Sequence, residues 1–146
     1  MKTILLIGRI LFVILFLQAV PFHFTAEAIK YASSSGVPFA SFLVPASGVL
    51  ACIGALSVLL GYKAKWGAWF LVMFLIPVTF FMHAFWKIAD PVQAQYQMSM
   101  FWKNISILGS ALMLTYFGSG PFSIDYQKTE IRKAVKEAMR KELINT

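Results

Sequence analysis

Four long runs of hydrophobic residues divide the chain, and short polar segments separate them. The runs cover residues 4–24, 39–60, 66–86 and 98–117. Because an α-helix rises about 1.5 Å per residue, about 20 apolar residues cross the hydrocarbon core of a bilayer. The pattern predicts an all-α membrane protein, with a bundle of four transmembrane helices formed by residues 1–124.

The last segment, residues 125–146, has a different pattern. Ile131, Val135, Met139 and Leu143 recur every four residues and would line one face of a helix, while charged residues occupy the rest of its circumference. We expect a basic amphipathic helix in the cytoplasm. It either lies on the cytoplasmic leaflet, with its cations near anionic headgroups, or docks on a partner protein.

The distribution of lysine and arginine predicts the orientation. With four spans, ten of the 13 cations fall on one side of the membrane and three, Lys30, Lys87 and Lys103, on the other. The ten are Lys2, Arg9, Lys63, Lys65, Lys128, Arg132, Lys133, Lys136, Arg140 and Lys141. Because cytoplasmic loops carry the excess of positive charge, both termini are expected in the cytoplasm.

Glycines within the apolar runs are expected to allow close helix packing. They are Gly8, Gly48, Gly54, Gly67 and Gly109. Pro45 and Pro77 also lie within runs, and each removes a backbone donor, which favours a kink or a local polar cavity.

The composition supports the membrane assignment. The 146 residues are 59% hydrophobic and 13% charged, whereas soluble domains carry about 25% charged residues. A net charge of +7 is compatible with nucleic acid, but the charge lies beside a membrane segment and no recognition motif accompanies it, so we expect no nucleic-acid partner. The one cysteine, Cys52, cannot form an internal disulfide, and no spacing of Cys and His predicts a metal site.

Polar side chains inside a span are costly in lipid, so each is a candidate for ligand binding. The candidates are Arg9, Gln18, His23, His83, Lys103 and Asn104. Since no Asp or Glu lies within a span, Arg9 must contact a backbone carbonyl, a lipid phosphate, a carboxylate of the tail or a ligand. The alternative is that Arg9 extends to the headgroups. The pattern does not indicate catalytic residues.

Five of these candidates are expected in the outer half of three spans. Gln18 and His23 lie near the end of the first span, His83 near the end of the third, and Lys103 and Asn104 near the start of the fourth. Histidine exchanges protons near neutral pH, so such a cluster is suited to binding a quinone carbonyl. The alternative is an interfacial belt, because both histidines have aromatic neighbours and Lys103 can extend to the headgroups.

Several short motifs occur in a fixed order along the chain. They are Gly8-Arg9, Ser35-Gly36-Val37-Pro38, Leu59-Leu60-Gly61-Tyr62, His83-Ala84-Phe85-Trp86, Lys103-Asn104 and Gly120-Pro121-Phe122-Ser123-Ile124-Asp125. On these motifs the chain resembles the DoxX family of small bacterial membrane proteins, up to about Tyr126. The resemblance implies a four-helix, multi-pass protein of the bacterial inner membrane. The chain departs from that family at His23, where a lysine is common, and lacks a glutamate in the second span.

The resemblance implies a function near the quinone pool. Some members of that family are small subunits of quinone-linked oxidoreductases, so we expect an accessory or anchoring subunit that has a redox partner protein. A small carrier or lipid-interacting protein with no redox role is the second interpretation. A lone quinone-dependent oxidoreductase is the third, because the sequence has no haem, flavin, iron–sulfur or CxxC signal. Quinone is the one cofactor that the resemblance implies. The sequence does not indicate the oligomeric state.

Overall fold

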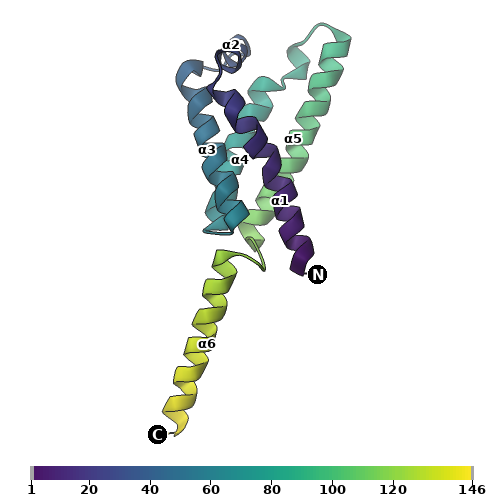
Figure 1. Cartoon of the computed structure of the whole chain (residues 1–146). Coiled ribbons are helices and arrows are strands. Elements are labelled where there is room, and N and C mark those ends of the chain that lie inside the picture. The colour runs from purple at the N-terminus through teal and green to yellow at the C-terminus, as the bar shows by residue number, and fades with distance from the viewer. Residues whose placement is uncertain (1, 146) are drawn as a thin grey trace.

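The structure is a computed structural model that describes residues 2–145, and all of its regular secondary structure in that range is helical. The elements in chain order are α1 (Lys2–Ala19), η1 (Val20–Phe24), α2 (Ala26–Ser34), α3 (Ala40–Leu60), α4 (Ala64–Met82), η2 (Phe85–Lys87), α5 (Pro91–Phe117) and α6 (Ile124–Asn145). The two η elements are short 3₁₀ helices. Figure 1 shows α1 to α5 gathered in a bundle, with α6 projecting away from the end where α1 begins.

Within residues 2–145, three segments are long and apolar enough to cross a membrane. They are Lys2–Phe24, Ala40–Leu60 and Ala64–Lys87, with mean hydropathies of 2.4, 2.2 and 2.0. Helix α5 is longer, at 27 residues, but it is less apolar because Lys103, Asn104 and several serines interrupt its hydrophobic sequence. The four-helix transmembrane bundle is therefore not confirmed, and the fourth span remains a prediction.

Helix α5 begins well before the predicted residue 98. The Asp90 side chain accepts a hydrogen bond from the backbone N–H of Gln93, at 2.7 Å, and Pro91 occupies the first helical turn. Both features favour a helix start, since an N-cap acceptor satisfies a free N–H and proline lacks one. The predicted span, residues 98–117, lies within α5; the hydrophobic pattern did not include the first turns of this helix because they are polar.

The polar segment between the first two predicted spans contains a helix of its own. In α2, the Thr25 hydroxyl caps the first turn by accepting from the N–H of Ala28 at 3.2 Å. Ala28 and Ala32 are buried and pack with Ala40 and Val44 of α3. This short helix therefore covers one end of the bundle (Figure 1).

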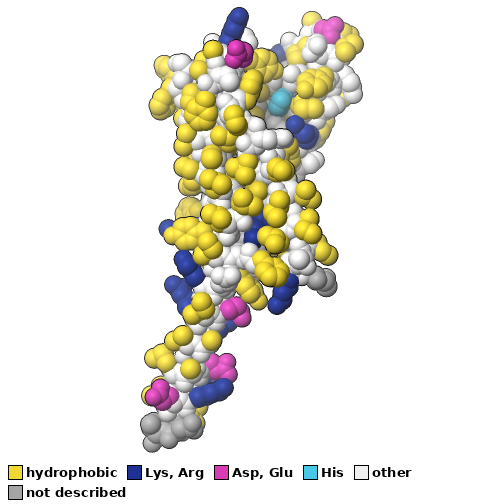
Figure 2. Space-filling view, viewed as in Figure 1, with side chains coloured by type: hydrophobic (Ala, Val, Ile, Leu, Met, Phe, Trp, Pro, Cys, Tyr) yellow, Lys and Arg dark blue, Asp and Glu magenta, His cyan; other side chains and the backbone are white. Residues whose placement is uncertain are grey.

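The core lies between α1, α3 and α4. Its buried members include Val13 and Phe16 of α1, Ala55 and Val58 of α3, and Leu71 of α4. Helix α5 packs on α4 and contributes one buried residue, Ala111, to this cluster of the described residues. The outer surface of the bundle is strongly apolar, as Figure 2 shows for one face.

The glycine prediction is confirmed in part. A Cβ at Gly54 would lie 2.9 Å from the carbonyl oxygen of Gly67, so α3 and α4 approach closely there. Gly48 faces His23 in a similarly tight contact. At Gly8 and Gly109, however, an added Cβ would meet nothing within 4 Å, so these two do not serve close packing within the described chain.

One segment, residues 118–125, consists of the loop after α5 and the first two residues of α6, and it contacts α1 and the start of α4. The Arg9 guanidinium of α1 donates to the carbonyl oxygens of Ser119, at 3.0 Å, and Phe122, at 2.7 Å. The Asp125 carboxylate accepts from the N–H groups of Lys63 and Ala64, both at 3.0 Å, and thereby caps the start of α4. We call this arrangement the arginine–aspartate junction.

The turn between α3 and α4 fits against this junction. Gly61 has a φ of 64°, its carbonyl oxygen accepts from the N–H of Asp125 at 2.9 Å, and a Cβ at this position would collide with Ser123. Only glycine satisfies both the left-handed backbone and the close approach. The turn and the loop are thus matched to each other although they lie about 60 residues apart.

Helix α6 extends from the junction, and the Nζ atom of Lys128 near its start lies 4.7 Å from the centroid of the Tyr62 ring. Its apolar residues, Ile131, Val135, Met139 and Leu143, are all exposed. The ion pairs on its surface are local, between Lys133 and Glu130 and between Lys141 and Glu137. The predicted amphipathic helix is present, while its contact with a leaflet or a partner remains a prediction.

We expect Asp125→Ala to destabilise the bundle. The change removes the acceptor of two backbone N–H groups at the start of α4, and loss of such a cap costs about 1–2 kcal/mol. Thermal unfolding of the purified protein in mild detergent measures this as a lower melting temperature. Glu137→Ala, at an exposed ion pair of α6, is the control and leaves the melting temperature unchanged; equal effects of the two variants would contradict the capping role.

Candidate functional site

An apolar cavity of about 640 Å³ lies among η1, α2, α3 and α4. Its apolar wall includes Phe22, Ala32, Val37, Leu43, Val44, Leu50, Met73, Phe74, Val78 and Phe81. The polar side chains that line it are His23, Tyr31, Ser47 and His83. Ligand sites in proteins commonly combine a mostly apolar wall with a few polar groups, so this cavity is the candidate functional site.

The cavity lies where α3 and α4 are no longer in close contact. Helices α3 and α4 are closest where Gly54 meets Gly67, and the cavity lies further along both helices, at residues 43–50 and 73–82. Pro77, which lines the cavity, cannot donate the helical hydrogen bond to Met73. Helix α2 and η1 then cover the opening between α3 and α4 at this end.

The position of His23 is fixed by a hydrogen bond to the preceding helical turn and by a close contact with α3. Its Nδ1 lies 2.9 Å from the carbonyl oxygen of Ala19, and its ring centroid lies 5.4 Å from that of Phe74. A Cβ at Gly48 would lie only 2.6 Å from the Cβ of His23. Since a carbonyl only accepts, Nδ1 carries the proton, and Nε2 of the neutral ring is left as an acceptor.

His83 belongs to a hydrogen-bond chain that connects three elements. Its Nδ1 lies 2.7 Å from Oε1 of Gln97 in α5, and Nε2 of Gln97 donates to the Tyr31 hydroxyl of α2 at 3.1 Å. The Tyr31 hydroxyl donates in turn to the carbonyl oxygen of Met82 at 3.3 Å. With these directions Nδ1 of His83 is the donor, so its Nε2 is also left as an acceptor.

The structure brings together two of the five residues expected in the outer half. His23 and His83 line the same cavity. Gln18 and Lys103 are exposed, and Nζ of Lys103 lies 3.3 Å from Sδ of Met100. Asn104 is buried in α5 but is not part of the cavity wall.

Arg9 lies elsewhere and has a different role. Its side chain is only 4% exposed, so it does not extend to the headgroups, and two loop carbonyls supply its contacts. Its Nε makes no hydrogen bond with any residue in the range 2–145. Of the four kinds of contact expected from the sequence, backbone carbonyls are the kind observed.

Tyr31 and Gln97 were missed because both lie in segments that the hydrophobic pattern assigned to connections. One signal for Gln97 was available, since it precedes Asn104 by seven residues and so lies on the same face of a helix, two turns away. In the described residues 2–145, no group of three or more His, Cys, Asp or Glu side chains is placed to bind a metal ion.

We expect Gly48→Ala to disturb this site. The new methyl group would displace the His23 side chain, and such overpacking costs about 1–3 kcal/mol. A lower melting temperature in detergent measures the effect. The matched control is Gly109→Ala, where the methyl group meets open space and the helix gains about 0.5–1 kcal/mol. If both variants melt alike, His23 does not lie against α3 as described.

Residues 1–131 match the SURF4 family. The chain is 31% identical over 125 residues to "Surfeit locus protein 4 homolog" of Schizosaccharomyces pombe, a match that covers 84% of this chain and 37% of that protein. It is 34% identical over 122 residues to "Inner membrane protein YqjF" of Escherichia coli, covering 82% of this chain and 88% of the relative. It is also 27% identical over 128 residues to "Inner membrane protein YphA" of E. coli, covering 84% and 89% respectively. No solved structure matches the chain.

These matches correct the assignment made from short motifs. The resemblance to the DoxX family is wrong, because the match over residues 1–131 is to another family. The redox function that the resemblance implied is wrong as well, since neither the family nor these relatives carry a redox description. The three apolar spans and the inner-membrane relatives instead identify a multi-pass membrane protein. The chain belongs to the SURF4 family.

Proposed function

We propose that this protein binds an amphipathic, lipid-like molecule in the cavity among η1, α2, α3 and α4. The observation that carries the proposal is the cavity itself, which has a volume of about 640 Å³ and an almost entirely apolar wall. This volume lies within the range of about 300–1,000 Å³ that is typical of small-molecule sites. An apolar chain would replace empty space or disordered water by contacts with Leu50, Phe74 and Val78.

The two histidines that line the cavity favour a ligand that donates a hydrogen bond. In His23 and His83 the Nδ1 atoms already contact Ala19 and Gln97, so the Nε2 atoms of the neutral rings are the acceptors that remain. A hydroxyl group or a protonated carboxyl group supplies the matching donor. The ligand class is therefore an apolar chain that ends in a hydroxyl or carboxyl group.

The bilayer offers a route into the cavity. Leu43, Met73 and Phe81 line the cavity and are also among the exposed hydrophobic residues of the outer surface, at 40%, 59% and 39% exposure. A ligand dissolved in the hydrocarbon region would reach the cavity by displacing these side chains, without passing through water. This route is consistent with an apolar ligand and disfavours a soluble polar one.

We infer a four-span arrangement in the bacterial inner membrane, with both termini in the cytoplasm. Helix α5 is 27 residues long, so it extends about 40 Å and matches the thickness of a bilayer, and it packs along α4. The start of α1 and the start of α6 lie at the same end of the bundle, where Lys2, Lys63 and Lys65 also occur (Figure 1). The inner-membrane relatives support the choice of membrane.

We expect Ala46→Phe to abolish ligand binding, because the phenyl ring would fill part of the cavity that Ala46 lines. The protein is purified from native membranes in mild detergent, and its bound lipids are extracted and identified by mass spectrometry. Wild-type protein retains a hydroxyl- or carboxyl-bearing lipid in near-stoichiometric amount, and Ala46→Phe retains at least tenfold less.

The matched control is Val49→Phe, which adds the same ring to an outward position of α3. It retains the wild-type amount of ligand, and the melting temperatures of both variants report whether they fold. Wild-type protein that carries no specific lipid, or a folded Ala46→Phe variant that carries as much as Val49→Phe, would reject the proposal.

The fourth span has a test of its own. In a Cys52→Ala background, single cysteines replace Lys87, between α4 and α5, and Lys133, in α6. A membrane-impermeant thiol reagent added to intact spheroplasts labels the cysteine at 87 and leaves that at 133 unlabelled until the membrane is opened. Labelling of both positions from the same side would show that α5 does not cross the bilayer.

A further inference from the structure

A second hollow, of about 400 Å³, lies at the end of the bundle from which α6 leaves. Its wall includes Lys63, Lys65 and Trp66 at the start of α4, Ser119 and Gly120 of the loop, and Lys133 of α6. This hollow lies at the opposite end of α4 from the apolar cavity described above and shares no lining residue with it. Unlike that cavity, it is lined by charged side chains, three lysines and two carboxylates, so it suits a different ligand.

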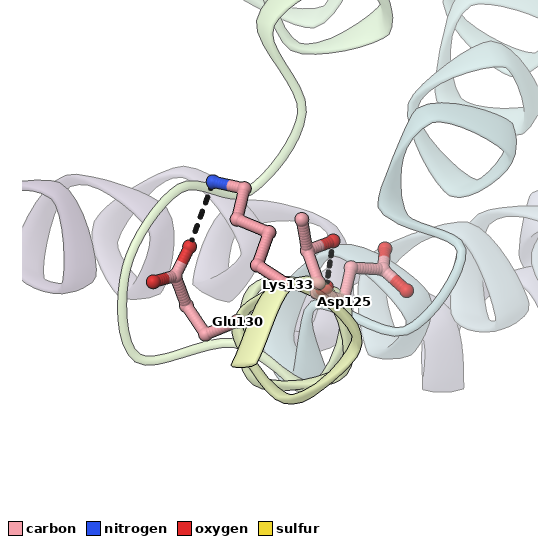
Figure 3. Close-up of polar contacts among 4 residues, drawn as sticks. Asp125, Glu130 and Lys133 are labelled. Carbon is pink, nitrogen blue, oxygen red and sulfur yellow. Dashed lines mark hydrogen bonds and ion pairs between the residues drawn. The ribbon is translucent and has the colours of Figure 1, made fainter. Parts of the chain in front are cut away.

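The carboxylates around this hollow are already engaged. Both oxygens of Asp125 accept from the backbone at the start of α4, and Glu130 forms an ion pair with Lys133 at 3.0 Å. Figure 3 shows the side chains of Glu130 and Lys133 pointing toward each other, while the Asp125 carboxylate points away from them. The hydrogen bond with Glu130 raises the pKa of Lys133, which keeps that ammonium group charged.

Two lysines of the hollow have no such partner. Among residues 2–145, neither Lys63 nor Lys65 forms an ion pair. The Lys65 stem lies over the loop, since a Cβ at Gly118 would be 3.5 Å from Cε of Lys65. The Nζ atom of Lys63 lies 5.8 Å from the centroid of the Tyr62 ring, a cation–π contact. Two lysines without a carboxylate partner therefore line the hollow.

The surroundings of the hollow are those of a membrane boundary. Trp66 and Phe117 line it and are 67% and 71% exposed, and Tyr116 next to Phe117 is 75% exposed. Exposed aromatic rings beside lysines are typical of the level at which lipid headgroups lie. A ligand in the hollow would thus have charge on one side and hydrocarbon on the other.

We propose that this hollow binds the headgroup of an anionic phospholipid, with the phosphate between Lys63 and Lys65 and the acyl chains along Trp66 and Phe117. Lysine ammonium groups bind phosphate as compact charges and hydrogen-bond donors. The apolar flank selects a lipid over a free phosphate ion, which would gain nothing from the two aromatic rings. A zwitterionic headgroup offers less net charge to the unpaired lysines, so the site prefers phosphatidylglycerol to phosphatidylcholine.

The test compares lipid retention by full-length variants. Wild-type protein, Lys63→Gln/Lys65→Gln and Lys30→Gln/Lys87→Gln are purified in mild detergent, and native mass spectrometry measures retained phosphatidylglycerol and phosphatidylcholine after addition of equal amounts. Wild-type protein retains phosphatidylglycerol at least fivefold better. The Lys63/Lys65 variant loses that preference, whereas the variant of two lysines from the opposite end of the bundle keeps it.

Two further arms separate charge from fold and lipid from free anion. Lys63→Arg/Lys65→Arg keeps both charges and retains the preference, and circular dichroism establishes that every variant is helical. Soluble glycerol phosphate at millimolar concentration does not displace the lipid. Displacement by glycerol phosphate, an unchanged preference in Lys63→Gln/Lys65→Gln, or an equal loss in Lys30→Gln/Lys87→Gln would each overturn the proposal.

Discussion

The buried charge of Arg9 is the constraint on which the arrangement of the chain depends. An arginine inside an apolar helix must find polar partners, because a charged group left alone in a low-dielectric region is very costly. Arg9 finds them in the carbonyl oxygens of Ser119 and Phe122, which fixes the loop that follows α5 against α1. Phe122 has a left-handed φ of 56°, a conformation that costs a non-glycine residue about 1–2 kcal/mol, and the bond to Arg9 helps to hold it. Once the loop is in place, Asp125 reaches the free N–H groups at the start of α4.

The two ends of the bundle are consequently built in different ways. At the end near α6, hydrogen bonds join α1, α4 and the segment 118–125, and Gly54 and Gly67 allow α3 and α4 to pack closely. At the other end, a cavity separates the helices. His83, Gln97 and Tyr31 connect α4, α5 and α2 around its rim. The tightly packed end therefore supplies contacts that offset the cost of a cavity at the other end, since a cavity in a core is destabilising.

The sequence predicted the apolar helices, which the hydrocarbon of a bilayer requires. It did not predict the features that depend on contacts between helices. Three of the four apolar runs correspond to helices able to cross a bilayer, because hydrocarbon requires an unbroken apolar helix. The start of α5 at Pro91 and the helix α2 were not predicted. A helix cap and a short face of buried alanines hardly change the hydrophobic pattern of the sequence. The pairing of His83 with Gln97 joins two elements through a turn whose shape the pattern does not define. Gly8 and Gly109 were expected inside the bundle but lie at its surface, because glycine content does not say which face of a helix is turned inward.

The error in the family assignment has a physical explanation. The motifs that carried the resemblance include Arg9, Gly61 and Asp125, and these are the residues of the arginine–aspartate junction. Each of these residues has a structural role. Arg9 is a buried cation that binds loop carbonyls, Asp125 caps a helix, and Gly61 lets two backbone segments approach closely. These roles are architectural and involve no ligand. Motifs of this kind therefore indicate architecture, while function must be argued from the cavity at the other end, whose histidines and tyrosine owe their positions to contacts made only in the folded chain.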